Sequence, residues 1–211
     1  LLNQKIKTIY AIERDIRCVN ALKDIFLPID NRVKIIAGDA LELDISKLSN
    51  NKVKIISNLP YNIATKLLVN WLQKINSISS ITCMFQREVA DRLVAKPGTK
   101  SYGRLSIISQ WLCDVKIEFN VKPHSFKPAP KITSTLVTLT PRSSPLAFAH
   151  WDDLEKITAL AFGQRRKMLR VSLKNLPFDF DALGINPTDR AENLNVKMFC
   201  KLAEAYRSFK R

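Results

Sequence analysis

The chain has 211 residues, and its 34 Lys and Arg exceed its 19 Asp and Glu to give a formal charge of +15. The hydrophobic share of 46% and the charged share of 25% are ordinary for a folded protein, which excludes intrinsic disorder for most of the length. No apolar run approaches the roughly 18 residues of a membrane-spanning helix, and we expect neither a membrane protein nor a secretory precursor.

Three short runs rich in β-branched residues predict strands near the start of the chain, at residues 7–12, 32–37 and 52–57. Between the first two, apolar residues at helical spacing predict a helix over residues 14–26, which ends before Pro28. Such a strand, helix, strand order with almost continuous apolar strands is typical of a parallel sheet covered by helices. The sequence therefore predicts a doubly wound, Rossmann-like α/β domain, in which ligands bind at the carboxyl ends of the strands.

The chain continues with alternating helices and strands. The last two strands of this part alternate like an antiparallel pair and are joined by a proline-rich loop that contains Phe126. A second loop, over residues 96–103, is basic and is expected to be flexible. The predicted helices lie at 63–75, 88–95 and 104–113, and the predicted strands at 80–86, 115–121 and 131–140.

Residues 142–150 are a predicted linker, because they begin with a stretch of Ser and Pro and separate two kinds of pattern. Beyond them, apolar residues at helical spacing predict helices over residues 151–175 and from 188 to about 209. We therefore divide the chain into an α/β domain over residues 1–141, this linker, and a small all-helical domain over residues 151–211.

The positive charge favours a polyanionic partner, and nucleic acid is the commonest polyanion that a soluble basic protein meets. A lysine-rich surface that only solvates the protein is the alternative, and it explains scattered lysines better than clusters. Two clusters are predicted to contact phosphates. One contains Arg87, Arg92, Lys96, Lys100 and Arg104, and the other contains Arg165, Arg166, Lys167, Arg170 and Lys174.

The cysteines, Cys18, Cys83, Cys113 and Cys200, are far apart in the sequence and include no C-x-x-C pair. This spacing provides neither a zinc site nor a disulfide framework, and the two histidines are equally isolated. We predict four buried thiols, no metal site, and a reducing, cytoplasmic location.

Polar residues follow the first two predicted strands, at the edge where a doubly wound sheet binds its cofactor. Glu13 follows the first strand, where a carboxylate typically accepts hydrogen bonds from ribose hydroxyl groups. Gly38, Asp39 and Ala40 follow the second strand, where a carboxylate can accept a hydrogen bond from an adenine amino group. An ordinary surface glutamate and a Gly-Asp turn are the alternative explanations.

Asn58, Leu59, Pro60 and Tyr61 follow the third strand and carry the strongest chemical signal in the chain. An exocyclic aromatic amine is a poor nucleophile, because its lone pair is delocalised into the ring. The Asn58 side-chain oxygen and a backbone carbonyl beside Pro60 can accept its two protons and turn the lone pair toward a methyl donor. Tyr61 offers a face on which the base stacks. This pattern favours in-line methyl transfer over the alternative of a turn with a packed tyrosine.

Seven strings resemble, in this order, those of the KsgA family of S-adenosylmethionine-dependent small-subunit rRNA adenine dimethyltransferases, and the resemblance extends over residues 8–203. The Asn58 to Tyr61 turn also resembles DNA adenine methyltransferases, whereas the blocks at residues 96–110 and 164–167 do not. The strings are AIERD, GDALELD, SNLPYNIATKLL, QREVADRLVAKPGTKSYGRLSIISQ, SFKPAPKITSTLV, AFGQRRKMLRVSLKN and RAENLNVKMFCKLA.

The resemblance implies roles for the residues singled out above. Glu13 is similar to the ribose ligand of S-adenosylmethionine, Asp39 with Ala40 to the adenine ligand, and Asn58 to the residue between the donor and the target amine. The same Asn58 to Tyr61 turn would hold the amine, and Tyr61 with Phe126 would enclose the flipped adenine. A core phenylalanine that closes its loop is the alternative for Phe126.

The implied activity is methyl transfer from S-adenosylmethionine to N6 of two adjacent adenosines near the 3′ end of small-subunit rRNA. The implied partner is the immature small ribosomal subunit, whose rRNA the basic helical part would contact. The protein is expected to be a monomer and to have no membrane partner. A ribosome-assembly factor that binds RNA without catalysis and a DNA adenine methyltransferase are the alternatives.

The family also has an N-terminal segment with a glycine-rich loop, about 20 residues before the position of Glu13, and this sequence starts after it. We therefore expect this chain to bind the cofactor poorly or not at all and to expose unpaired strand edges and apolar sheet surface. Partial instability or a compensating partner is the expected consequence.

Overall fold

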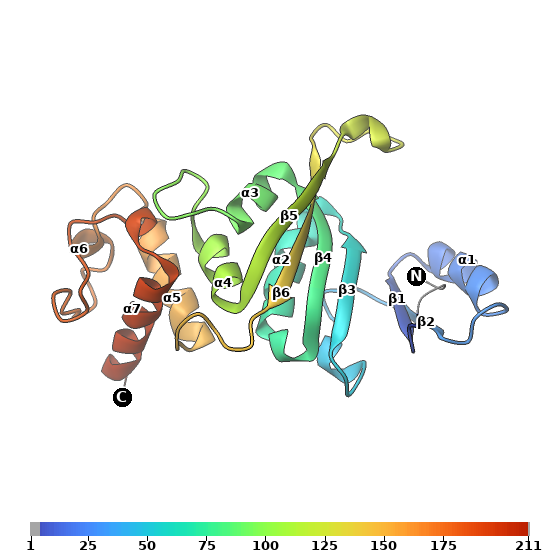
Figure 1. The fold of residues 1–211 in the computed structure, drawn as a ribbon, viewed down its shortest axis with the longest axis horizontal. Helices are drawn as coiled ribbons and strands as arrows, with labels where there is room; N and C mark the ends of the chain where they lie inside the picture. Colours follow the sequence, from blue (N-terminus) through green and yellow to red (C-terminus); the bar gives the residue numbers. More distant parts are fainter. Residues whose placement is uncertain (1–4, 211) are drawn as a thin grey trace.

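The computed structural model describes residues 5–210, and the first unit along the chain is a two-stranded parallel sheet (Figure 1). β1 (Ile9–Glu13) pairs with β2 (Val33–Ala37), and the helix α1 (Ile16–Phe26) connects them. These elements lie where the sequence predicted them. Because the pairing ends with Glu13 opposite Ala37, the residues that follow the two strands come out at one edge.

A second sheet contains the other strands in the order β3-β4-β6-β5. β3 (Val53–Asn58) pairs in parallel with β4 (Ile78–Gln86). β6 (Ser134–Pro141) lies between β4 and β5 (Cys113–Val121) and is antiparallel to both. The predicted antiparallel pair is confirmed, and the insertion of its second strand beside β4 gives a mixed sheet.

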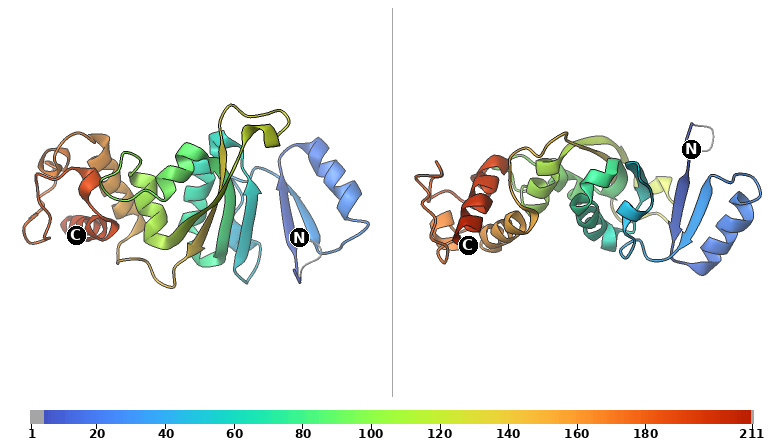
Figure 2. Two further views of the ribbon diagram at one scale, coloured as in Figure 1. Left: turned by 45° about the horizontal axis from the view of Figure 1, so that its top comes forward. Right: turned by 90° about the horizontal axis from the view of Figure 1, so that it is seen from below.

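Three helices cover one face of this second sheet, as Figures 1 and 2 show. They are α2 (Tyr61–Gln73), α3 (Arg87–Leu93) and α4 (Arg104–Leu112). The other face is more open, and exposure alternates along β3. The short 3₁₀ helices lie in the connections: η1 (Ile45–Lys47), η2 (Ile75–Ser77), η3 (Pro123–Ser125) and η4 (Ala191–Asn193).

The two sheets share no strand pairing within residues 5–210, although the sequence pattern predicted one parallel sheet. β1 pairs only with β2 and β3 only with β4, and the side chains of Ile12 and Ile56 on these strands are exposed. The expectation of unpaired strand edges is therefore confirmed for the described strands. A hydrogen bond from Tyr10 Oη to the Leu48 carbonyl, at 2.6 Å, ties β1 to the segment before β3.

The C-terminal part is helical, but its helices are shorter than predicted. α5 (Trp151–Gly163) was expected to run to residue 175, and α7 (Val196–Phe209) was expected to begin at residue 188. Only α6 (Leu169–Ser172) is α-helical between them.

Each correction has a local cause. Gly163 favours a helix end, and Gln164 leaves the helical conformation with a ψ of 56°. The chain then pairs with a distant segment, because Leu169 N donates to the Asp189 carbonyl at 2.7 Å. The Asn195 side chain accepts from Met198 N and so sets the start of α7.

Residues 142–150 contain neither helix nor strand and lie against α4. Trp111 Nε1 donates to the Ala147 carbonyl at 2.8 Å, and Leu146 N donates to the Trp111 carbonyl at 2.9 Å. One cluster of buried side chains includes residues of both the second sheet and α5 and α7. The division at residues 141 and 151 remains a prediction, and the parts on either side of it share this buried cluster.

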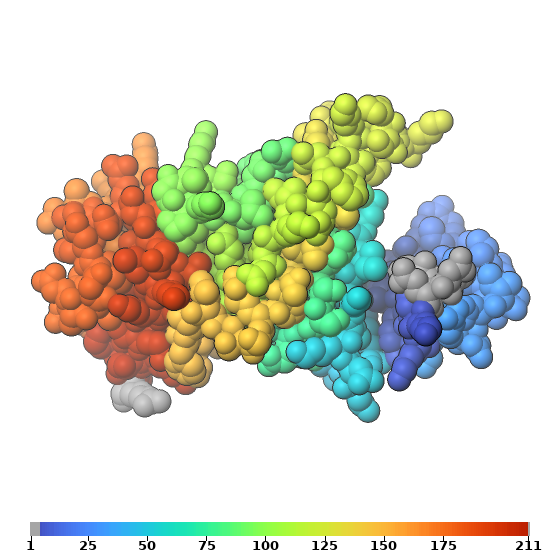
Figure 3. Space-filling model, viewed as in Figure 1, coloured from blue at the N-terminus to red at the C-terminus, as the bar shows by residue number. Residues whose placement is uncertain are grey.

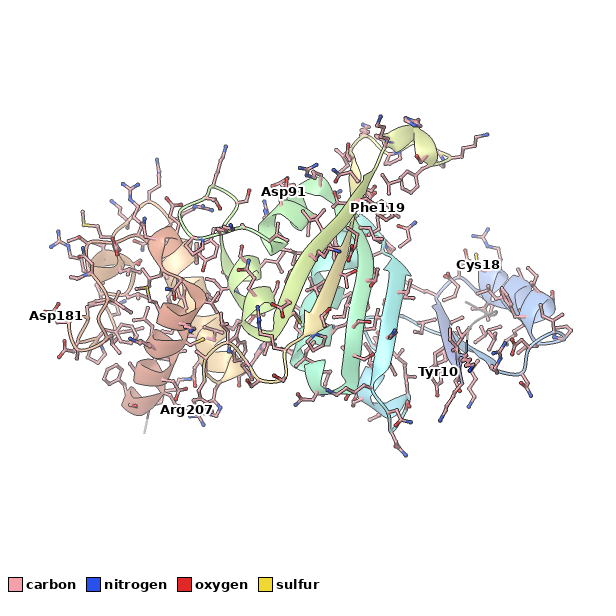
Figure 4. All side chains as sticks on the ribbon, in the orientation of Figure 1. Tyr10, Cys18, Asp91, Phe119, Asp181 and Arg207 are labelled. Atoms are coloured by element: carbon pink, nitrogen blue, oxygen red, sulfur yellow. The ribbon has the colours of Figure 1, made fainter. Side chains whose placement is uncertain are left out.

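Three of the four cysteines are buried, as predicted, and burial raises the pKa of Cys83, Cys113 and Cys200 to about 12 in each case. The prediction is wrong for Cys18, which is exposed on α1 (Figure 4), because Val19 is the fully buried residue of that helix. In the part of the chain that the structure describes, no helix combines the length and the hydropathy needed to cross a membrane.

A buried carboxylate joins the two long C-terminal helices. Asp153, in the first turn of α5, has a side chain that is only 2% exposed, and it accepts from Lys210 Nζ at 2.7 Å and Arg207 Nη1 at 3.1 Å. Burial on its own would raise the pKa of Asp153, but the hydrogen bonds from Lys210 and Arg207 outweigh it and hold this pKa below the ordinary carboxyl value.

Asp153→Asn is expected to lower the free energy of unfolding at neutral pH by about 1–2 kcal/mol, because Arg207 and Lys210 are partly exposed and regain water. The lowered folded pKa means that the stabilisation is complete above the unfolded pKa of about 4 and is lost as the pH falls through the folded value. Urea unfolding between neutral and acid pH measures both effects. Asp152→Asn, at the exposed neighbouring position, is the control, and equal losses in the two variants would contradict this role.

Candidate active site

The carboxylates that follow β1 and β2 lie at the same sheet edge, since Gly38 N donates to the Glu13 carbonyl at 2.9 Å. Glu13 Oε1 accepts from the backbone N–H groups of the next two residues at 2.7 and 2.8 Å. Asp39 Oδ1 accepts from Leu41 N at 2.9 Å, and its Oδ2 lies 3.7 Å from an Arg14 guanidinium nitrogen. Each carboxylate is thus oriented by the backbone through one oxygen. The second oxygen of Asp39 faces Arg14, whereas that of Glu13 has no hydrogen-bond partner among the described residues.

The Asn58 to Tyr61 segment lies where β3 ends and α2 begins. Asn58 is exposed, while the side chain of Leu59 is 5% exposed and belongs to the core, so Leu59 can contribute only its backbone. Pro60 is the residue before the helix, and its carbonyl accepts from Ile63 N at 3.1 Å. α2 begins at Tyr61, two residues earlier than predicted, and Pro60 is its N-cap residue.

Tyr61 is held by a strand that is far away in the sequence. Its phenolic oxygen forms a 2.5 Å hydrogen bond with Oγ of Ser134, the fully buried first residue of β6. Ser134 ends the proline-rich loop in which Phe126 lies, partly exposed, directly after η3. The two aromatic residues predicted to enclose a base are therefore carried by elements that this one hydrogen bond connects.

Strand register explains why Asn58 and the Phe126 loop lie at the same end of the sheet. Asn58 pairs with Met84 near the end of β4, and Gln86, the last residue of β4, pairs with Ser134. The loop between β5 and β6 therefore extends from the edge at which β3 ends, and Figure 1 shows it projecting beyond the sheet. Within residues 5–210, no hydrogen bond or ion pair joins Glu13 or Asp39 to this edge, because β1 and β2 form their own sheet.

The basic residues of the first predicted cluster divide into two groups. The arginines have acidic neighbours: Arg87 donates to Asp91 at 2.9 Å, Arg92 pairs with Glu88, and Arg104 lies 3.6 Å from Glu155. Lys96 and Lys100 are exposed and have no ion-pair partner among the described residues.

In the second cluster Arg165 differs from its neighbours. Its side chain is 38% exposed, and Nε donates to Glu192 Oε2 at 2.9 Å. Arg166, Lys167, Arg170 and Lys174 are exposed and have no acidic partner in the described part of the chain.

Comparison with known proteins decides the family. The model of the family described as "Ribosomal RNA adenine dimethylase" matches residues 1–208. The chain belongs to this family. It is 49% identical over 209 residues to the ribosomal RNA small subunit methyltransferase A of Rhodospirillum rubrum, covering 97% of this chain and 72% of that protein. It is 46% identical over 218 residues to the protein of the same description in Xanthobacter autotrophicus, covering 100% of this chain and 75% of that one.

Solved structures agree on the fold of this ribosomal RNA adenine dimethylase family member. A dimethyladenosine transferase from Plasmodium falciparum matches 96% of this chain and 82% of its own, with a TM-score of 0.82 and 24% identity. The 23S rRNA methyltransferase ErmE matches 95% of this chain and 82% of its own, with a TM-score of 0.68 and 21% identity. The predicted Rossmann-like methyltransferase fold with a helical C-terminal region is confirmed.

Two residues of this family member were missed by sequence reasoning, Ser134 as the partner of Tyr61 and Glu192 as the partner of Arg165. The separations are 73 and 27 residues, and neither a serine at the start of a strand nor a glutamate in a turn is a signal by itself. The alternation of apolar and polar residues from Lys131 to Thr140 predicted the strand that contains Ser134, but it did not predict which strands lie beside it.

Tyr61→Phe and Ser134→Ala are each expected to lower the free energy of unfolding by about 1–2 kcal/mol, because each leaves the other hydroxyl group of this partly buried pair without its partner. The double variant should lose less than the sum, since it removes both polar groups of one hydrogen bond. Urea unfolding of the three variants gives the coupling. Tyr10→Phe removes a separate hydrogen bond and serves as the control that should add to Ser134→Ala; additive losses for Tyr61 and Ser134 would refute the coupling.

Proposed function

We propose that this protein methylates adenine N6 in small-subunit ribosomal RNA, using S-adenosylmethionine as the methyl donor. The observation that carries this proposal is the exposed Asn58 at the end of β3, followed by Leu59, Pro60 and Tyr61, in a chain whose length is matched almost entirely by the rRNA adenine dimethylase family. Relatives described as small subunit methyltransferase A favour the small subunit over DNA and favour catalysis over RNA binding alone.

Glu13 and Asp39 fit the donor's nucleoside part. When bound, S-adenosylmethionine supplies an electrophilic methyl group on a sulfonium centre. The second carboxylate oxygen of Glu13 has no partner among the described residues, so it can accept from ribose hydroxyl groups. Asp39, with Ala40 beside it, is assigned to the adenine amino group, and backbone N–H bonds already fix both carboxylates.

Asn58 and the backbone on either side of Pro60 are assigned to the target amine. The Asn58 side-chain oxygen can accept one N–H, and the carbonyl of Leu59 can accept the other, because the Pro60 carbonyl is already used by Ile63 N. Two acceptors that hold both amine protons draw the nitrogen toward a tetrahedral geometry and expose its lone pair. Neutral acceptors suit this step, since the amine carries no charge before the methyl group arrives.

The flipped base would lie between Tyr61 and Phe126. The Tyr61 ring is held by its hydrogen bond to Ser134, so it does not have to be ordered when the base arrives. Phe126 lies in a loop with prolines at positions 123, 128 and 130, which limits the conformations of that wall. Stacking on aromatic rings offsets the cost of taking the base out of its own stack.

The RNA backbone is assigned to those cations of the two clusters that have no acidic partner within residues 5–210. These are Lys96, Lys100, Arg166, Lys167, Arg170 and Lys174, whereas Arg87, Arg92 and Arg104 are partly neutralised within the protein and contribute less.

Asn58→Ala is expected to lower methylation of immature small subunits by about 100-fold or more, because the amine loses a positioned acceptor. Binding of the rRNA should stay unchanged, since every cation assigned to the RNA backbone remains in place. Transfer of label from S-adenosylmethionine and filter binding measure the two effects. Asn51→Ala, at an exposed position in the connection before β3, is the matched control. Persistent methylation by the Asn58 variant would remove that residue from the chemistry, and label accepted by naked duplex DNA instead would exclude an rRNA enzyme.

Replacing Arg166 and Lys167 together by Gln is expected to weaken rRNA binding and to reduce the slope of log K against log salt by about 0.7–0.9 for each phosphate that these side chains neutralise. Replacing Lys23 and Lys52, two exposed lysines outside the clusters, removes the same charge and serves as the control. Equal slopes in the two double variants would mean that only the net charge matters.

A further inference from the structure

The loop over residues 96–103, named here the basic loop, is docked on the helical C-terminal part and is not the flexible connection that its composition predicted (Figure 3). Tyr102 is fully buried, and its ring meets Phe162 of α5 edge-on at 6.3 Å. Phe162 in turn stacks on Phe199 of α7 at 5.7 Å. An aromatic side chain therefore anchors this loop between two helices of the C-terminal part.

Glu192 joins the basic loop to the second basic cluster. Its backbone carbonyl accepts from Gly98 N at 2.7 Å, and its carboxylate accepts from Arg165 at 2.9 Å. Arg165 also donates from Nη2 to the Thr99 carbonyl at 3.2 Å. Gly98 has a φ of +82°, which a residue with a side chain rarely adopts, so the loop conformation that reaches Glu192 depends on glycine.

The segment that follows Arg165 is fixed to the same place. Leu169 N donates to the Asp189 carbonyl at 2.7 Å and Arg170 N donates to the Pro187 carbonyl at 3.0 Å, so the chain around Arg170 lies against the turn that precedes Glu192. The basic loop carries the exposed Lys96 and Lys100, and the segment after Arg165 carries the other exposed cations. These two segments therefore meet at Glu192 and the turn before it.

We propose that Arg165 and Glu192 form a clamp that holds the basic loop and the second cluster as one RNA-binding surface, with Arg165 bound to the protein and not to phosphate. This inference rests on the proposed function, because it takes the RNA as the partner. Ordering two separate basic segments would cost conformational entropy on binding, and the clamp removes that cost beforehand.

The proposal predicts an effect of opposite sign from simple electrostatics. Glu192→Ala makes the protein more positive, which on charge alone strengthens binding of a polyanion. If the clamp is required, the same change weakens binding of small-subunit rRNA by about three- to tenfold, the cost of ordering one or two side chains. Asp181→Ala removes the same charge from an exposed site in the same part of the molecule (Figure 4) and should bind as well as the unchanged chain or slightly better.

A second pair of variants preserves the charge. Arg165→Lys keeps the cation but cannot bind Glu192 and Thr99 together through a planar fork, so it should weaken rRNA binding. Arg17→Lys, at an exposed position on α1 outside both clusters, should not. Binding over a salt series and thermal unfolding are measured for all four variants. If Glu192→Ala does not fold, the comparison of Arg165→Lys with Arg17→Lys decides.

Amide hydrogen exchange of the basic loop separates this proposal from the proposed function. Glu192→Ala should speed exchange at Gly98, whose N–H donates to residue 192, whether or not RNA is the partner. Faster exchange with weaker rRNA binding supports the clamp. Unchanged or tighter rRNA binding overturns it, and so does equal binding by Arg165→Lys and Arg17→Lys. Failure of the Arg166 and Lys167 double variant to lower the salt slope would instead reject the RNA surface itself.

Discussion

The pairing of β4 with β3 on one side and β6 on the other is the constraint on which the candidate site depends. Parallel pairing places Asn58 beside Met84, and antiparallel pairing places Ser134 beside Gln86. A turn that follows one strand and a loop that precedes another therefore meet at one edge, although they are far apart in the sequence. A shift of one residue in either register would reverse the faces to which these side chains point, so sheet register, more than any single contact, sets the geometry of the base site.

Local sequence patterns predicted local structure well. They failed to predict helix ends and strand order, which depend on contacts with residues far away in the sequence. The strands that contain Ile9 and Val33 and the turn after Asn58 could be predicted, because periodicity, β-branching and turn residues act over a few positions. The helix from Trp151 was predicted too long, because helical spacing continues past Gly163 while the backbone turns to pair near Asp189. The strand order was not predictable either, because alternation of apolar and polar residues indicates a strand but not the strand with which it pairs.

The site residues show the same division. Tyr61 could be singled out as a candidate from its position after Pro60. The buried Ser134 that binds its hydroxyl group could not, since only the folded sheet brings the two residues together. Arg165 was grouped with its neighbours because a run of cations has a uniform charge. In the fold its position is partly buried and faces Glu192, so burial and partner, not charge, distinguish a structural arginine from one that is available to phosphate.

Charge and chemistry occupy different places in this molecule, and the physics of the reaction explains why. Phosphate contacts supply affinity through counterion release and require exposed cations, which the basic loop and the second cluster provide. Methylation of an amine requires neutral acceptors and aromatic walls, because a cation beside Asn58 would repel the incoming sulfonium centre and compete for the same oxygens. The proposed base site is accordingly assigned to an amide, a carbonyl and two rings. In this proposal, the separation of the two functions lets the net charge of +15 attract RNA while the groups assigned to the target nitrogen remain uncharged.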